Sequence, residues 1–154
     1  MFSGAPQNHN ATLDRATYTI SFQRVFLVTR DQVFDAWTKP EEVSAWWDPT
    51  GKPLSECTID LRPGGAFRFV NQDSAHSPPF AGEYLIIERP AKLVFEALGA
   101  VGTVLLEEQA GQTRLLVTIR CASAERLEMY LKVGVDVGTD RTLDNLVGFL
   151  ANRK

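Results

Sequence analysis

Tryptophan is the first residue type whose spacing in this sequence suggests binding chemistry. Trp37, Trp46 and Trp47 lie within eleven positions, and each indole offers a large apolar ring and one hydrogen-bond donor. For Trp37, packing of a helix against a sheet is the favoured role, since core aromatics are common. Two adjacent indoles cannot both face the core from one helical turn. One of Trp46 and Trp47 is therefore expected to be partly exposed or to line a pocket.

Two glycines near the C-terminal end are the second candidates. Gly134 and Gly138 lie on one stripe of a predicted helix, where each glycine costs up to about 1 kcal/mol relative to alanine. One interpretation is structural: the backbone approaches the sheet closely, or the helix breaks at Gly134. The other is that the missing side chains leave room for a ligand beneath the helix. The sequence favours neither.

Aromatic residues at alternating strand positions could line an apolar pocket of the kind that small molecules occupy, although core packing is the more common role. They are Phe67, Phe69, Phe80, Tyr84 and Phe95. Tyr84 is the best candidate for a polar contact, because a buried hydroxyl needs a partner. Arg62, which precedes a Pro-Gly-Gly turn, is a second candidate, but a solvated turn charge is the favoured interpretation.

Residue patterns for catalysis or metal binding are sparse. The two histidines, His9 and His76, have no cysteine or carboxylate near them at ligand spacing, so we expect neither a metal site nor a cofactor. The sequence contains no HExxH, GxSxG, Walker or GxGxxG motif. The strand carboxylates are expected on a solvated sheet face rather than as an acid–base pair: Glu83, Glu96, Glu107 and Glu108. Enzymatic activity is not expected.

Composition places these residues in an ordinary globular chain. The 154 residues are 44% hydrophobic and 23% charged, which excludes disordered and fibrous classes. We expect a polar tail over residues 1–15 and a single domain over residues 16–154. The net charge of -3 and the lack of a basic run argue against nucleic acid and membrane surfaces as partners.

Two further features concern the compartment. No apolar run is long enough for a signal peptide or a bilayer span, so we expect the protein in the cytoplasm. Cys57 and Cys121 each lie in an apolar alternation, where a free cysteine acts as a small hydrophobe rather than as half of a redox pair.

The first half of the predicted fold is a strand followed by two short helices. Alternation over residues 17–23, continuing to residue 28, predicts a strand. Thr29 or Asp31 can cap a first helix. Thr38 followed by Pro40 and two glutamates indicates the start of a second helix, with threonine as its cap.

The second half of the sequence predicts a meander and a closing helix. Short alternating segments joined by turn residues indicate about six strands between residues 54 and 121. From residue 123 the apolar period changes to three and four, which predicts a short helix and a long one over about residues 135–151. The order predicts an α+β fold in which a curved antiparallel sheet grips the terminal helix and encloses an interior.

Several segments carry a resemblance to a known family. WTKPEEV (37–43), WWDP (46–49) and DLRPGGAF (60–67) are its strongest part, followed by FAGEY (80–84), KLVF (92–95), GQTRL (111–115) and GVDVG (134–138). The sequence resembles the START-like SRPBCC superfamily, in the branch named after the carboxy-terminal domain of the activator of the heat-shock protein ATPase. The resemblance covers roughly residues 17–150. It implies a helix-grip fold with about seven strands and a cavity between sheet and terminal helix, but it does not define an activity.

The resemblance also has two departures and a functional implication. Asp48 stands where the family commonly has glycine, and Thr139 where it commonly has an aromatic residue, which implies a different shape or polarity at the cavity mouth. We expect binding of a hydrophobic or amphipathic small molecule, lipid-like or aromatic, without catalysis. The candidate ligand-binding residues are Trp37, Trp46, Trp47, Arg62, Phe67, Phe69, Phe80, Tyr84, Phe95, Leu131, Val135, Gly138 and Thr139.

Three alternatives remain open at this point. A co-chaperone role, in which the domain stimulates a heat-shock ATPase, ranks lower because the chain is too short for the separate amino-terminal domain of the eukaryotic activator. A cyclase or hydrolase of the same superfamily would need a buried polar residue with a shifted pKa inside the cavity. A homodimer through sheet edges or through Trp46 and Trp47 is compatible with the sequence, but no pattern requires it.

Overall fold

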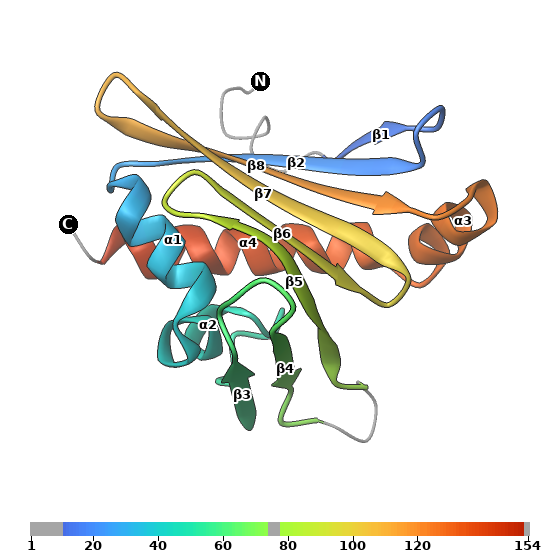
Figure 1. Ribbon diagram of the computed structural model, residues 1–154, viewed down its shortest axis with the longest axis horizontal. Helices are drawn as coiled ribbons and strands as arrows, with labels where there is room; N and C mark the ends of the chain where they lie inside the picture. The colour runs from blue at the N-terminus through green and yellow to red at the C-terminus, as the bar shows by residue number, and fades with distance from the viewer. Residues whose placement is uncertain (1–10, 74–77, 153–154) are drawn as a thin grey trace.

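A computed structural model describes residues 11–73 and 78–152 of the chain. In these residues one open antiparallel sheet of eight strands runs in the order β1-β2-β8-β7-β6-β5-β4-β3. The long helix α4 (Val135–Ala151) lies along one face of the sheet, with α3 (Ala124–Lys132) at one end and α1 (Arg30–Thr38) and α2 (Pro40–Trp46) towards the other (Figure 1). The predicted α+β fold with a curved sheet and a long C-terminal helix is confirmed.

The strands follow the predicted meander with short turns between them. Their bounds are β1 (Thr12–Asp14), β2 (Thr19–Phe26), β3 (Glu56–Ile59), β4 (Ala66–Val70), β5 (Phe80–Glu88), β6 (Lys92–Ala97), β7 (Ala100–Gln109) and β8 (Gln112–Cys121). Gly99 and Gly111 adopt positive φ angles of 79° and 80° in the turns before β7 and β8, as the turn signals at these positions predict.

Alternation of buried and exposed residues identifies the face that packs on the helices. Along β2, Ile20, Phe22 and Phe26 are buried while Gln23 and Val25 are exposed. Strands β7 and β8 continue the pattern across the sheet. Because successive side chains of a strand point to opposite faces, these buried rows form one continuous surface facing α4.

The N-terminal segment differs from the prediction. The sequence predicts a loose polar tail as far as Arg15, but Thr12–Asp14 forms β1 and pairs with β2, with Thr12 opposite Ser21. Arg15 forms an ion pair with Glu128 of α3. Three residues are too few for an alternating pattern to show in sequence, so this strand is not predicted and the sheet has one strand more than the resemblance implies. Residues 1–10 lie outside the described residues.

The two short helices are confirmed, but one of the predicted caps is wrong. Thr29 caps α1 through a capping box with Gln32: its side chain accepts from the Gln32 amide, and the Gln32 side chain accepts from the Thr29 amide. Thr38, predicted as the cap of α2, ends α1 instead, and its hydroxyl donates to the Phe34 carbonyl at 2.8 Å. Lys39 is the residue before α2, with Pro40 at the first helical position.

Helices α3 and α4 meet at Gly134, one of the two glycines for which the sequence allowed two interpretations. Gly134 has φ +82° and lies between the helices, a conformation that favours glycine. The helix break is therefore the role of Gly134. A β-carbon added at Gly138 would meet no heavy atom within 4 Å, so close packing against the sheet does not explain this second glycine.

A buried arginine joins α4 to the sheet. Arg24 on β2 is 1% exposed, and its Nη2 lies 3.1 Å from Asp140 Oδ1 and 3.2 Å from Asp144 Oδ1 on α4. Its Nη1 donates to the Gln23 carbonyl at 2.8 Å. A cation is stable at such a depth because carboxylates and carbonyls surround it. No pattern in the sequence indicates this contact.

Candidate functional site: an aromatic cluster

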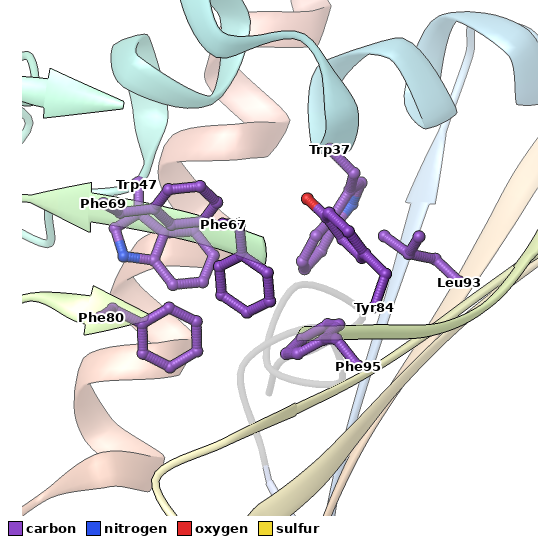
Figure 2. A pocket seen from close by; sticks show the side chains of 8 residues that line it. All are labelled: Trp37, Trp47, Phe67, Phe69, Phe80, Tyr84, Leu93 and Phe95. Atoms are coloured by element: carbon purple, nitrogen blue, oxygen red, sulfur yellow. The ribbon is translucent and has the colours of Figure 1, made fainter. Parts of the chain in front are cut away.

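Eight side chains from five segments converge on one small hollow between the sheet and the first two helices (Figure 2). Helix α1, the residue after α2, and strands β4, β5 and β6 contribute them: Trp37, Trp47, Phe67, Phe69, Phe80, Tyr84, Leu93 and Phe95. We call these eight residues the aromatic cluster. The register explains the convergence, because Phe69 lies opposite Phe80 and Tyr84 opposite Phe95 in neighbouring strands.

The rings of the aromatic cluster pack mainly against one another. The centroids of Trp47 and Phe69 are 4.9 Å apart with planes at 71°. Phe67 meets Phe95 at 5.6 Å and 87°, and lies 5.0 Å from Tyr84. Edge-to-face contacts at such distances are favourable for aromatic pairs. The ring faces and edges are thus largely engaged within the cluster itself.

The free volume inside the aromatic cluster is small. It amounts to about 10 Å³, close to the least space that holds one water molecule. The resemblance implied an open cavity between the sheet and the terminal helix, whereas this hollow has no residue of α4 in its lining and is nearly filled. The aromatic side chains occupy the space themselves, because small residues on neighbouring strands leave room for their rings. Gly102 lies opposite Phe95, and Gly82 opposite Phe67.

The two adjacent tryptophans have different environments, one in the core and one at the hollow, as the geometry of a helical turn predicts. Trp46 is fully buried, and its Nε1 donates to the Ala36 carbonyl at 2.9 Å. Trp47 is half-buried and lines the hollow. Trp46 supports the site from behind through its ring contact with Trp37 at 4.9 Å, but it is not part of the lining.

The lining residues carry two indole N–H groups and one phenol, but the surface of the hollow itself is apolar. Trp37 is 7% exposed, and its Nε1 has no hydrogen-bond partner among the described residues. Tyr84 is 2% exposed, and burial, with a smaller effect from nearby Cys57, raises the pKa of its hydroxyl above the usual value. Burial, with a contribution from Glu41, also raises the pKa of the Cys57 thiol to about 11. The phenol and the thiol are therefore both neutral at pH 7.

A hydrogen-bond network holds Trp47 and the following residues against α4. Thr142 donates to the Trp47 carbonyl at 3.1 Å, and Asn145 donates to the Asp48 carbonyl at 2.9 Å. The buried Asp48 carboxylate accepts from Asn71 Nδ2 at 3.0 Å and from the Thr50 amide at 2.8 Å. Burial acts to raise the pKa of Asp48, but the hydrogen bonds from Asn71 and Thr50 outweigh it and the pKa is lowered.

The structure brings together seven of the thirteen predicted site residues: Trp37, Trp47, Phe67, Phe69, Phe80, Tyr84 and Phe95. It adds Leu93, which sequence reasoning misses because an aliphatic strand residue looks like any other core residue. Arg62 is exposed and pairs with Asp60, with 2.9 Å between Nε and Oδ2, which favours the solvated-turn interpretation. The other residues outside the lining are Trp46, Leu131, Val135, Gly138 and Thr139.

The two family departures also lie outside the lining. Asp48 turns its carboxylate to Asn71 and Thr50, so it anchors the segment that carries Trp47 rather than changing the polarity of the hollow. Thr139 is half-buried on α4.

Charged and metal-binding groups are distributed as follows. Glu83, Glu96, Glu107 and Glu108 are exposed, as alternation predicted. Within residues 11–73 and 78–152, no three His, Cys, Asp or Glu residues are grouped so that they could hold a metal ion. His9 and His76 lie outside the described residues. None of the described helices combines the length and apolar character needed to cross a bilayer.

A second hollow lies away from the aromatic cluster, where the segment between β2 and α1 meets the β7–β8 hairpin. It has a volume of about 510 Å³ and a mixed polar and apolar lining. Its wall includes Leu27, Val28, Arg30, Pro90 and Glu108. Leu27 is 61% exposed, so this second hollow is an open groove on the surface.

The architecture defines the class of protein. A curved antiparallel sheet closed by a long C-terminal helix is the helix-grip arrangement of START-like domains. Residues 27–151 match the family described as "Activator of Hsp90 ATPase homolog 1-like protein", and the chain belongs to this family. No curated protein matches the sequence closely enough to count as a relative.

Solved structures agree with this assignment. A Rhodobacter sphaeroides protein is 23% identical with a TM-score of 0.82, over 94% of this chain and 99% of that one. A Nitrosomonas europaea protein is 22% identical with a TM-score of 0.79, over 88% and 95%. CalU16 from Micromonospora echinospora is 26% identical with a TM-score of 0.63, over 86% and 75%. The first two likenesses show the fold alone.

Proposed function

We propose that this domain binds a small, largely apolar molecule at the aromatic cluster and does not transform it. The observation that carries the proposal is the convergence of seven aromatic residues and Leu93 on one hollow. Pockets for small molecules are mostly apolar with a few placed polar groups. Among the eight lining residues there is no carboxylate, imidazole or amine, so the lining offers contacts to a ligand rather than an acid or a base.

Binding requires the cluster to open. A hollow with about 10 Å³ of free volume admits no organic molecule, whereas an apolar cavity of about 150 Å³ binds benzene. Trp47 and Phe80 are half-buried, in contrast to the buried Phe67 and Tyr84. We infer that Trp47 and Phe80 form the movable outer wall. The free energy of moving them lowers the observed affinity, as for any protein whose binding-competent state is a minor one.

Removal of one wall residue tests the proposal. Phe80→Ala takes away a ring of the outer wall and leaves space for a benzene-sized ligand, so affinity for ethylbenzene is expected to rise about tenfold or more over the unaltered protein. Isothermal titration calorimetry measures both affinities. Phe149→Ala is the matched control, because Phe149 is also half-buried against the core but lies on α4 outside the lining. We expect the control to leave ethylbenzene binding unchanged.

Two results would overturn the proposal. Absence of ethylbenzene binding to both the unaltered protein and Phe80→Ala, up to the solubility limit, would show that the cluster is only a packed core. An equal gain in Phe80→Ala and Phe149→Ala would show that any loosened part of the core takes up the probe. Circular dichroism confirms in each case that the variant is folded.

A chaperone-directed role is the second candidate, and the observation that favours it is the family description over residues 27–151. In this role the domain would bind an Hsp90-type ATPase and raise its rate of ATP hydrolysis. A steady-state ATPase assay of the chaperone with and without the purified protein tests it. Stimulation that survives Phe80→Ala would place this activity outside the aromatic cluster.

A further inference from the structure

Helix α4 has no side chain in the lining of the aromatic cluster, yet two of its residues bind segment 47–48, which carries the Trp47 ring. The Thr142 hydroxyl donates to the Trp47 carbonyl at 3.1 Å. The Asn145 side-chain amide donates to the Asp48 carbonyl at 2.9 Å. Trp47 directly follows α2, and the carbonyls at the end of a helix have no partner within that helix. Side chains of α4 therefore supply the partners that water supplies at an exposed helix end.

The Asp48 side chain fixes the same segment from another side. Its carboxylate accepts from Asn71 Nδ2 at 3.0 Å and from the Thr50 amide at 2.8 Å, and Asn71 directly follows β4. Among the eight lining residues, Trp47 alone lies outside the helices and strands, whereas the other seven are held in the sheet or in α1. Apart from the Trp47 amide, which donates to the Val43 carbonyl at 3.0 Å, side-chain hydrogen bonds hold segment 47–48 to its neighbours.

We infer that the hydrogen bonds from Thr142 and Asn145 hold the aromatic cluster closed, and that segment 47–48 moves away from α4 when a ligand enters. Such a shift draws the Trp47 ring away from Phe80, whose centroid is 5.0 Å from it (Figure 2), and enlarges the hollow. Thr142 and Asn145 are positioning residues: they touch no ligand, but they set the fraction of molecules whose hollow is open. This inference rests on the proposed function, since it names what controls access to the same site.

Thr142→Val tests the inference, because valine has the shape of threonine without the hydroxyl. The Trp47 carbonyl then lacks this donor in the closed state and gains water when the segment moves. The affinity for ethylbenzene, measured by isothermal titration calorimetry, is therefore expected to rise about threefold to tenfold over the unaltered protein. Thr142→Ser keeps the hydroxyl and is expected to bind like the unaltered protein. Thr113→Val is the matched control with no expected change: it removes another buried hydroxyl, which donates to the Val28 carbonyl at 2.6 Å outside the aromatic cluster.

A measurement on the unaltered protein guards against poor folding of the variants. In ¹H–¹⁵N correlation spectra, the Asn145 side-chain amide signals are expected to shift with ethylbenzene, because the hydrogen bond to the Asp48 carbonyl lengthens or breaks. Binding without this shift would overturn the inference and leave the proposed function in place. The same holds for an unchanged affinity in Thr142→Val, or for an equal gain in Thr142→Val and either Thr142→Ser or Thr113→Val. Absence of ethylbenzene binding in the unaltered protein, Thr142→Val and Phe80→Ala would overturn the proposed function as well.

Discussion

Gly102→Ala is a small change with a large expected effect on the aromatic cluster. Gly102 faces the interior from β7 and lies directly opposite Phe95 on β6. A β-carbon at this position would lie 2.5 Å, 2.6 Å and 3.2 Å from three ring carbons of Phe95. Ordinary contact between carbons is about 3.5–4.0 Å. The ring of Phe95 would therefore have to retreat by about 1 Å.

The direction of retreat is restricted by neighbours. Phe95 packs on Phe67 at 5.6 Å and on Phe80 at 6.4 Å, and the free volume beside it is only about 10 Å³. Overpacking of a filled core costs about 1–3 kcal/mol. For a protein of this size each kcal/mol lowers the Tm by about 2–4 °C. We expect Gly102→Ala to lower the Tm by about 2–12 °C, measured by circular dichroism or calorimetry.

Gly138→Ala is the matched control with the opposite sign. A β-carbon at Gly138 meets no heavy atom within 4 Å, and the residue lies inside α4 at negative φ. Alanine is favoured over glycine there by about 0.5–1 kcal/mol, so the Tm is expected to rise and ethylbenzene binding to stay unchanged. An unchanged or raised Tm in Gly102→Ala, beside a normal response of Gly138→Ala, would refute the conclusion that the cluster is tightly filled.

Three further predictions concern the scaffold. Arg24→Met removes the buried cation that bridges β2 to Asp140 and Asp144. It should lower the free energy of unfolding, measured with urea, by about 1–3 kcal/mol. An unchanged free energy of unfolding would mean that this ion pair does not stabilise the fold. Thr29→Ala breaks the capping box of α1 and should cost about 1 kcal/mol in the same assay, whereas the exposed Thr12→Ala should cost less. Because the pKa of Asp48 is lowered by folding, its contribution to stability is present above the unfolded value of about 3.9 and is lost as the pH falls below it. Urea titrations from about pH 5 to about pH 3 should show a steeper loss in the unaltered protein than in Asp48→Asn, and parallel slopes would contradict this.

The sequence predicts those features of the fold that depend on residues close together along the chain. The β6–β7 and β7–β8 turns carry Gly99 and Gly111 at positive φ, and such turns have a local residue signature. Thr29 is followed by Gln32 at capping-box spacing. Period-two alternation defines the faces of the longer strands, so Glu83 and Glu96 could be placed outside.

Features that depend on side chains far apart in the sequence cannot be predicted in this way. Arg24 occupies an inward position of β2 because carboxylates of α4, more than a hundred residues later, neutralise it. In the sequence, room for a ligand is only one of two interpretations of Gly138. In the structure, the volume of the hollow is determined by rings such as Phe67 and Phe95, which lie over the small residues Gly82 and Gly102. How far rings fill a space depends on rotamers and packing in three dimensions, and no period in the sequence records it.

The location of a bound apolar probe tests the central claim most directly. Leu93 is the one aliphatic residue among the eight that line the aromatic cluster, while Leu27 and Val28 line the open groove beside the β7–β8 hairpin. Intermolecular nuclear Overhauser effects from ethylbenzene to ¹³C-labelled methyl groups distinguish the two places. We expect Overhauser effects to the Leu93 methyl groups. Effects to Leu27 and Val28 alone, or none at a saturating concentration of the probe, would contradict binding at the aromatic cluster.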